Sequence, residues 1–296
     1  MKRLCSLVTV ILVLSGVAQC QNSAKELSAS LSTVGPYFDQ EPPGDSPELF
    51  APGLISRDGY FEHSAAVYSP DMTEVYWSAL DRSDRYYKMY SLKQVDGKWT
   101  APDVVPFLEE NRSEKGPVFS PDGNSLYFDL NCDIWVVRRT GEGWSEPEKV
   151  PGINDASACE SVCGLTRDGS IFFTRYKNEP GSEEVYVSRR SGEGFAAPQK
   201  IERDFRAGFM RLGGVYVAPD ESYMIMELQI DPATGGIFAS YKTNDGGWSD
   251  VIRLPVGWAR FPYVTPDGKY LIFMRREGIY WVNAGIIEDT KSENLK

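Results

Sequence analysis

Seven ionisable residues occupy related places in the sequence, each a few residues ahead of a tight-turn motif. They are Glu62, His63, Glu114, Lys115, Glu160, Arg211 and Arg260. Carboxylates and cations contributed by successive segments could neutralise one another in a ring of salt bridges, bind a polar ligand or a cation, or supply catalytic carboxylates. Glu114 and Glu160 hold the same place relative to their turns, and repeats share architecture before chemistry. The pattern therefore favours the ring of salt bridges.

The turn motif that follows these residues recurs five times, 46 to 52 residues apart. Its copies are Ser69-Pro70-Asp71-Met72, Ser120-Pro121-Asp122-Gly123, Thr166-Arg167-Asp168-Gly169, Ala218-Pro219-Asp220-Glu221 and Thr265-Pro266-Asp267-Gly268. Proline followed by aspartate and glycine is typical of a tight hairpin turn. The repeated aspartate is expected to accept backbone N–H hydrogen bonds within its own turn rather than to act in catalysis.

Apolar segments precede and follow each turn, and two more signals recur in phase. A third apolar segment such as 134–139 is followed, after a glycine-containing turn, by an aromatic segment such as 144–147. Four short strands per repeat, arranged radially, are typical of a β-propeller. The turn motif with the segments Leu126-Tyr127-Phe128 and Asp133-Ile134-Trp135-Val136 resembles the TolB-type, WD-repeat-like β-propeller family of bacterial envelope proteins. That resemblance implies an exported, all-β protein and names no activity.

The last repeat lacks an aromatic fourth segment, and the missing strand is found near the N-terminus. Residues 50–56 resemble residues 144–153, with Phe50 in the place of Trp144. We therefore expect a five-bladed β-propeller of four-stranded blades over residues 48–287, whose last blade is closed by an N-terminal strand.

Cysteine usage depends on this architecture. Cys132 and Cys159 would lie on adjacent blades at one rim, where an oxidising compartment allows a disulfide and leaves Cys163 buried and free. Reduced buried thiols are the alternative, followed by a metal or redox role. The spacing of Cys159 and Cys163, with no histidine nearby, is a poor zinc signature, and His63 is the only histidine of the chain.

The first twenty residues have the character of an export signal. Lys2 and Arg3 precede an apolar run that is too short to span a bilayer and ends in small residues. Cleavage after Ala18 would release a secreted protein, whereas lipid attachment at Cys20 would produce a lipoprotein. Residues 21–47 have the composition of a flexible leader, and residues 288–296 that of a polar tail. We expect a periplasmic protein, an outer-membrane lipoprotein or a secreted protein.

Charge and motif content restrict the function. The chain carries a formal net charge of −11, which opposes binding to nucleic acid or anionic lipid. No phosphate-binding loop, nucleophile elbow or zinc-protease motif occurs in the sequence. The leading hypothesis is an exported, non-catalytic propeller that binds a protein or a small polar ligand, such as a saccharide, in the bacterial cell envelope. Tyr86 and Tyr87, in a loop at the rim, could stack on such a ligand.

Two alternatives stay open. Five-bladed glycosidases place three carboxylates at the inner ends of successive blades, and Glu62, Glu114 and Glu160 could act here as base, modulator and acid. That mechanism requires one acid with a raised pKa. The same glutamates could instead hold Ca²⁺ in the central channel of a structural propeller; no other cofactor is expected.

Overall fold

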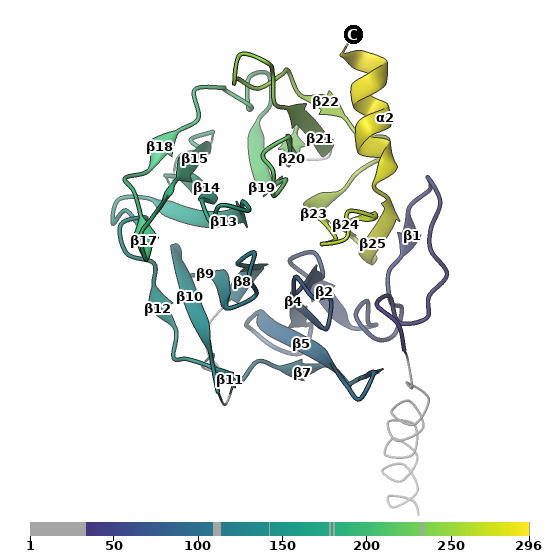
Figure 1. Cartoon of the computed structure of the whole chain (residues 1–296). Coiled ribbons are helices and arrows are strands. Elements are labelled where there is room, and N and C mark those ends of the chain that lie inside the picture. The colour runs from purple at the N-terminus through teal and green to yellow at the C-terminus, as the bar shows by residue number, and fades with distance from the viewer. Residues whose placement is uncertain are drawn as a thin grey trace, which may run out of the picture.

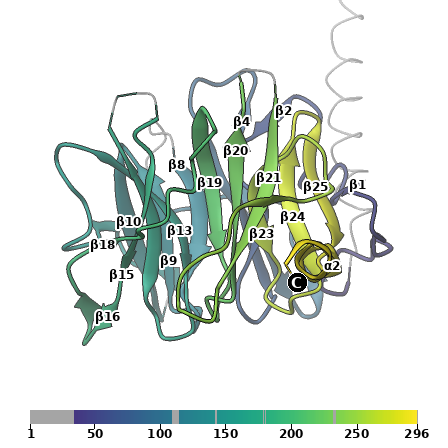
Figure 2. The same ribbon diagram turned by 90° about the horizontal axis from the view of Figure 1, so that it is seen from above.

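Five antiparallel sheets surround a central axis. The computed structural model describes residues 34–108, 114–141, 143–177, 179, 181–231 and 234–295, and of Glu114 only the backbone. Figure 1 shows the sheets arranged around the axis, and Figure 2 shows that their strands run between the two faces of the ring. The predicted five-bladed β-propeller is confirmed. The proposed export signal and Cys20 lie outside the described residues.

Each blade contains four strands, in chain order from the axis outwards in blades 1 to 4. In blade 1 they are β2 (Tyr60–Glu62) with β3 (Val67–Tyr68), β4 (Glu74–Asp81), β5 (Lys88–Val95) and β7 (Asp103–Val104). In blade 2 they are β8 (Glu114–Phe119), β9 (Ser125–Leu130), β10 (Asp133–Thr140) and β12 (Glu148–Lys149). In blade 3 they are β13 (Cys159–Leu165), β14 (Ile171–Tyr176), β15 (Glu184–Ser188) and β18 (Gln199–Lys200). In blade 4 they are β19 (Arg211–Val217), β20 (Tyr223–Gln229), β21 (Gly235–Tyr241) and β22 (Ile252–Arg253). Blade 5 contains β23 (Arg260–Val264), β24 (Tyr270–Arg275) and β25 (Gly278–Asn283).

The sequence predicts that the aromatic segments form the fourth strands, and this prediction is wrong. They pair with the ends of the third strands in short ribbons, and the fourth strand follows each of them by a few residues. The ribbon strands are β6 (Lys98–Trp99), β11 (Gly143–Trp144), and β16 (Arg190–Ser191) with β17 (Gly194–Phe195). The physical reason is the length of the third strand. In blade 2, one end of β10 pairs with the aromatic segment β11, and its middle pairs with the fourth strand β12.

The hydrophobic core lies between neighbouring blades. Tyr76 and Met89 of blade 1, for example, pack with Leu126 and Phe128 of blade 2. Because each sheet is covered on both sides, the second and third strands are apolar at successive positions rather than at alternate ones. The turns between the first two strands are held by the repeated aspartates. Asp122, for example, accepts hydrogen bonds from Ser120 Oγ at 2.6 Å and Asn124 N at 3.0 Å.

The N-terminal segment closes the ring. Strand β1 (Glu48–Leu49) pairs with β25, with Glu48 opposite Trp281, and is the fourth strand of blade 5. The Phe50 N–H then donates to Ile279 O at 2.8 Å, just as the Val150 N–H donates to Ile134 O in blade 2. Phe50 therefore corresponds to Val150 and not to Trp144. The prediction that an N-terminal strand closes the ring is confirmed. Its alignment with blade 2 differs by six residues from the expected one.

The leader is ordered where the structure describes it. Tyr37 and Phe38 are buried in the cluster that joins blades 5 and 1. The Tyr37 ring lies 4.9 Å from that of Tyr270, and the Phe38 ring lies 4.8 Å from that of Trp99. Residues 34–47 are therefore part of the fold rather than a flexible tether, because these two aromatic side chains gain more by burial than the chain loses by ordering.

The C-terminus also differs from expectation. Residues 285–294 form helix α2 (Gly285–Asn294), which includes most of the segment expected to be a polar tail. Ile286 and Ile287 anchor the helix in the core between blades 4 and 5, and Tyr241 Oη donates to Ile287 O at 2.6 Å. Among the described residues, no helix has the length and apolar character needed to cross a membrane.

Removing residues 48–56 should abolish cooperative unfolding, because it exposes the edge of β25 and uncovers the core of blade 5. A milder variant, Phe38→Ala, should lower the free energy of unfolding by about 3 kcal/mol, since it leaves a cavity between blades 5 and 1. Urea unfolding followed by tryptophan fluorescence measures both effects. The exposed Val34→Ala is the matched control and should unfold like the parent. A deletion variant that unfolds as cooperatively as the parent would show that β1 is dispensable.

Candidate functional site

A cavity of about 1070 Å³ runs along the axis of the propeller. Its walls are the first strands of all five blades. One end lies among the repeated turns, where Pro121 and Pro266 line it, and the other lies where the first strands begin, at Arg211 and Arg260. We call this second end the mouth. A cavity of this size is at the upper end of the range for small-molecule sites.

The strand registers show which of the predicted residues are equivalent. Glu62, Glu114 and Glu160 each lie opposite the same position of the second strand, namely Ala79, Leu130 and Arg175. The next residue along each first strand forms a second set of equivalent positions, consisting of His63, Lys115, Ser161, Gly213 and Arg260. Successive side chains of a strand point to opposite faces of its sheet, so these two sets cannot lie on one surface.

The salt bridges at the mouth have other partners than those that the sequence predicts, and they are separate pairs rather than a ring. Glu160 accepts a charge-assisted hydrogen bond from Arg175 Nε at 2.7 Å. Neither Arg211 nor Arg260 pairs with Glu62 or Glu160, the predicted glutamates whose side chains are described. Their acidic partners are Glu183 and Glu227. Arg260 Nε donates to Glu227 Oε1 at 2.7 Å, and Arg211 Nε lies 3.9 Å from Glu183 Oε1.

The two predicted glutamates whose side chains are described, Glu62 and Glu160, do not converge on the cavity in the manner that a glycosidase needs. Glu62 is buried and is not part of the cavity lining, and burial raises the pKa of its carboxyl group. Glu160 lines the mouth, but its side chain is fully buried against Arg175. The side chain of Glu114 lies outside the described part of the structure. Of the three, only Glu160 is placed at the cavity by the described side chains.

Two acids that the sequence analysis missed link adjacent blades at the mouth. Asp129 on β9 and Glu227 on β20 occupy the same position in their second strands. Each carboxylate reaches the first strand of the next blade: Asp129 accepts from Ser161 Oγ and from Val162 N, and Glu227 accepts from Arg260. A charged residue within an otherwise apolar strand is the signal that could have indicated both.

Asp129 is the most perturbed of these acids. Burial raises the pKa of its carboxyl group to about 7, against the opposing effects of the hydrogen bonds from Ser161 and Val162 and of the nearby Lys115 ammonium. Folding therefore favours the protonated acid. Cys163 lines the same wall, and burial raises the pKa of its thiol well above the usual range, which keeps the thiol unreactive.

Glycine makes room for the second cross-blade acid. A Cβ atom on Gly213 would lie 2.5 Å from Cδ of Glu227, so no other residue fits there without displacing the carboxylate. The Gly214 N–H also points at Glu227 Oε2, at 3.4 Å. Because Glu227 is buried and paired, it holds the Arg260 guanidinium at the cavity wall.

Aromatic side chains take the place of acids at the other blade junctions of the mouth. The His63 ring lies 4.7 Å from that of Tyr87 and 4.8 Å from that of Phe261, so it bridges blades 1 and 5. Lys115 Nζ lies 5.4 Å from the Tyr87 ring, and the Arg260 guanidinium lies 4.8 Å from the Phe261 ring. These contacts form a continuous row of five side chains, which we call the aromatic wall. Its members are Lys115, Tyr87, His63, Phe261 and Arg260.

His63 is uncharged within this wall. Desolvation, together with the nearby charges of Lys115, Arg260 and Arg211, lowers the pKa of its imidazole to about 3. The imidazole therefore acts as a neutral aromatic ring over the physiological pH range.

Phe261 has an unusual backbone conformation. Its φ is +49°, in the left-handed region, whereas the equivalent position of blade 2 is filled by Gly116 with φ +59°. A non-glycine residue in this region costs about 1–2 kcal/mol. The neighbouring Gly214 permits the arrangement, because a Cβ there would lie 2.9 Å from Cδ1 of Phe261. A strained residue at a cavity mouth is a reason to look for function in its side chain.

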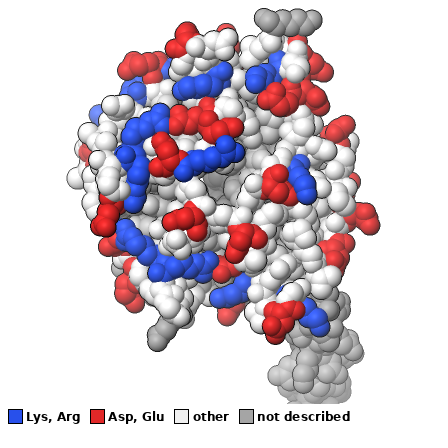
Figure 3. All heavy atoms as spheres, viewed as in Figure 1, with Lys and Arg blue, Asp and Glu red and all other residues white. Residues whose placement is uncertain are grey.

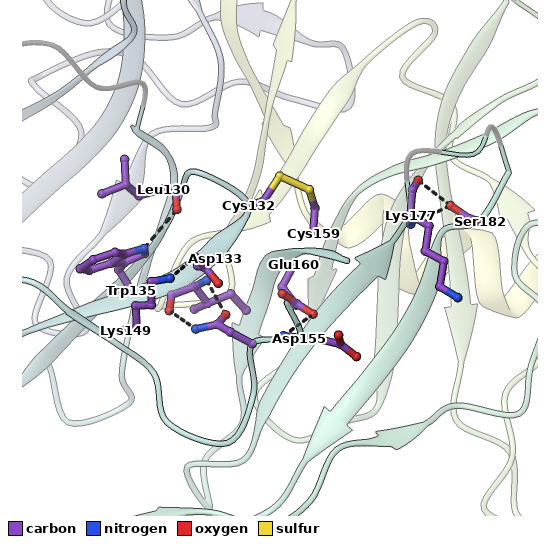
Figure 4. The surroundings of a disulfide bond; sticks show 12 residues. Leu130, Cys132, Asp133, Trp135, Lys149, Asp155, Cys159, Glu160, Lys177 and Ser182 are labelled. Carbon is purple, nitrogen blue, oxygen red and sulfur yellow. Dashed lines mark hydrogen bonds and ion pairs between the residues drawn. A yellow bond between two sulfur atoms is a disulfide. The ribbon is translucent and has the colours of Figure 1, made fainter. Parts of the chain in front are cut away.

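The predicted disulfide between Cys132 and Cys159 is confirmed, as is the free, buried Cys163. Figure 4 shows the bond joining the loop after β9 to the start of β13, directly beside Glu160. The Glu160 N–H also donates to Cys132 O at 3.0 Å, so two links hold blades 2 and 3 together at the mouth. The bond restricts the position of Glu160 relative to blade 2.

The described residues contain no group of three or more His, Cys, Asp and Glu side chains that could hold a metal ion. Acidic and basic side chains are interspersed on the face of the molecule shown in Figure 3. At the mouth, likewise, each of Arg175, Arg211 and Arg260 has an acidic partner within 4.0 Å. Paired charges of opposite sign partly cancel each other's field at the mouth.

No family model and no curated protein matches the chain. Solved structures resemble it at low identity. TolB from Acinetobacter baumannii is 16% identical, with a TM-score of 0.48 over 75% of this chain and 53% of that one, so this chain spans about half its length. A gluconolactonase from Xanthomonas campestris is 14% identical, with a TM-score of 0.49 over 82% and 95% of the two chains. The periplasmic gluconolactonase of Pseudomonas aeruginosa is 14% identical, with a TM-score of 0.45 over 70% and 61%. These similarities carry no argument about what this chain binds.

Loss of the disulfide should lower the free energy of unfolding by about 3.5 kcal/mol, the loop-entropy value for a bond across 27 residues. The double variant Cys132→Ser/Cys159→Ser, compared with the parent by urea unfolding, measures this loss. Reductant should destabilise the parent and leave the double variant unchanged, and Cys163→Ala should keep the response to reductant. Alkylation of all three thiols in the unreduced, unfolded protein would contradict the bond.

Asp129 should make the protein less stable as the pH rises from about 4 to about 7. In this interval the folded state binds more protons than the unfolded state, whose aspartate titrates near 3.8, so stability falls with pH and is constant above 7. The slope is at most about 1.4 kcal/mol per pH unit. Asp129→Asn should remove it, so that the variant gains stability relative to the parent between pH 5 and pH 8 in thermal unfolding. Melting curves that differ by the same amount at both values would contradict the raised pKa.

Proposed function

We propose that this chain is an exported, non-catalytic binding protein that holds a small polar ligand at the mouth of its central cavity. The observation that carries the proposal is the composition of the mouth. Polar side chains from five blades meet at a cavity of about 1070 Å³, and those at its walls are held in place by contacts between blades. Preorganised polar groups around a concave site are what small-ligand binding requires.

The distribution of charge supports a ligand that is polar without a large charge of its own. The junctions between blades 2 and 3, 3 and 4, and 4 and 5 carry Asp129, Glu183 and Glu227. Cations lie beside these acids, so the wall offers donors and acceptors in alternation. A polyanion such as a nucleic acid gains little from such a wall.

The positions of Glu62 and Glu160 favour binding over hydrolysis. A glycosidase needs two carboxyl groups that flank one bond in the cavity, one of them a protonated general acid. Among the described side chains, Glu62 is not part of the cavity lining and Glu160 is held by Arg175. The described acids likewise do not gather in a group that would bind Ca²⁺.

Export is part of the proposal and rests on two features. The N-terminal residues have the pattern of a secretion signal, and the Cys132–Cys159 bond is of a kind that persists in oxidising compartments. We propose the bacterial cell envelope as the location, with Cys20 as the lipid attachment site if the protein is anchored.

Calorimetric titration with panels of saccharides, amino acids, hydroxy acids and nucleosides tests the proposal. At least one class should bind, and Arg211→Ala should weaken that binding about tenfold or more, because it removes a charged donor at the mouth. Arg203→Ala is the matched control: this arginine also pairs with an acid, Asp250, but does not line the cavity. Binding that is equally strong in the Arg211→Ala variant would place the site elsewhere, and binding of no class would refute the proposal.

A further inference from the structure

The mouth of the cavity has two unlike halves. The junctions between blades 2 and 3, 3 and 4, and 4 and 5 are made by acids and their hydrogen-bond donors. The junctions on either side of blade 1 are made instead by the aromatic wall, where His63 lies between Tyr87 and Phe261. Because the blades form a ring, the aromatic half and the charged half face each other across the mouth (Figure 1).

This division suits one kind of ligand. A pyranose ring has an apolar face of C–H groups and an edge of hydroxyl groups, each of which both donates and accepts hydrogen bonds. The C–H face would pack on the rings of His63 and Phe261, which line the cavity. Hydroxyl groups would meet carboxylates and guanidinium groups in alternation on the opposite half, where charge-assisted hydrogen bonds are strong.

Other ligand classes fit less well. The rings of His63 and Phe261 are tilted by 43°, and those of His63 and Tyr87 by 64°, so they provide no parallel slot for a flat nucleobase. Two of the cations at the mouth that could attract a phosphate or a carboxylate are already paired, Arg260 with Glu227 and Arg211 with Glu183. A neutral ligand does not have to break these pairs.

Phe261 provides an independent reason to assign a role to the aromatic wall. Its backbone has the left-handed conformation that the equivalent Gly116 adopts without strain. The fold therefore needs no side chain at this position, yet blade 5 carries a half-buried phenyl ring that lines the cavity. Strain retained at a cavity wall points to a use for the ring outside the fold.

We propose that the mouth is a saccharide-binding site, in which a neutral sugar ring stacks on His63 and Phe261 and its hydroxyl groups bond to the charged half. This assignment rests on the proposed binding function and narrows it to one ligand class. Lys115 and Arg260 lie at the borders between the two halves, and Arg211 lies within the charged half. All three would bond to hydroxyl groups at the edge of the ring.

The decisive variant is Phe261→Gly. Glycine relieves the backbone strain while the ring is lost, so the variant should unfold at nearly the temperature of the parent. Calorimetric titration with maltose, cellobiose and chitobiose should show binding of at least one disaccharide to the parent, and Phe261→Gly should weaken it roughly three- to tenfold or more. Phe261→Tyr, which keeps an aromatic face, should restore it.

Two controls separate stacking from stability. Phe195→Ala removes a half-buried ring on an outer ribbon and should leave binding unchanged. Tyr87→Ala, at the rim, is a second variant that should weaken binding even if Phe261→Gly proves unstable, because it removes the ring that supports His63.

The outcomes distinguish the two proposals. Disaccharide binding that Phe261→Gly weakens and Phe261→Tyr restores supports the saccharide site. Binding of glutamate, citrate or adenosine at the mouth, weakened by Arg211→Ala, with no disaccharide bound, would overturn the saccharide assignment and leave the binding function standing. If none of these compounds binds, both are refuted. Disaccharide binding that is indifferent to Phe261 and Tyr87 would also overturn the aromatic wall as the site.

Discussion

Closure of the ring is the constraint on which the rest of this structure depends. A propeller sheet buries both faces against its neighbours, so an open ring would leave two faces and one strand edge exposed to solvent. Here strand β1 pairs with β25, and Tyr37 and Phe38 fill the junction between blades 5 and 1. Tyr37 Oη also donates to Asp267 at 2.8 Å, so the segment is tied to a turn of the last repeat. The segment from Tyr37 to Leu49 therefore joins blade 5 to blade 1, and we call it the clasp.

A closed ring forces the five first strands to meet around one cavity, and the mouth is built from what each blade offers its neighbour. The same second-strand position supplies Asp129 in blade 2 and Glu227 in blade 4, and both reach across to the next blade. Such links are buried enough to position side chains, and their contribution to stability is smaller than that of the apolar core. Their main consequence is that Arg260 and Ser161 have defined places at the cavity wall.

Differences among the repeats, rather than the repeat itself, create the asymmetry of the mouth. One first-strand position holds His63, Lys115, Ser161, Gly213 and Arg260 in the five blades. A uniform residue there would produce a symmetric ring with no distinct ligand face. The replacement of a glycine position by Phe261, and the neutral state of His63 among cations, make one half of the mouth aromatic. This asymmetry carries the proposed recognition of a sugar ring.

Local sequence determined the blades, because each turn depends only on a few adjacent residues such as Ser120 and Asp122. It also determined the disulfide, since adjacent repeats in phase bring Cys132 and Cys159 to one rim. The partners of Arg211 and Arg260, the clasp formed by Tyr37 and Phe38, and the burial of helix α2 were decided only by the tertiary structure. Strand alternation places Glu62 and His63 on opposite faces, and cross-blade contacts join residues far apart in sequence. Such pairings depend on how neighbouring sheets twist and pack, which no local pattern encodes.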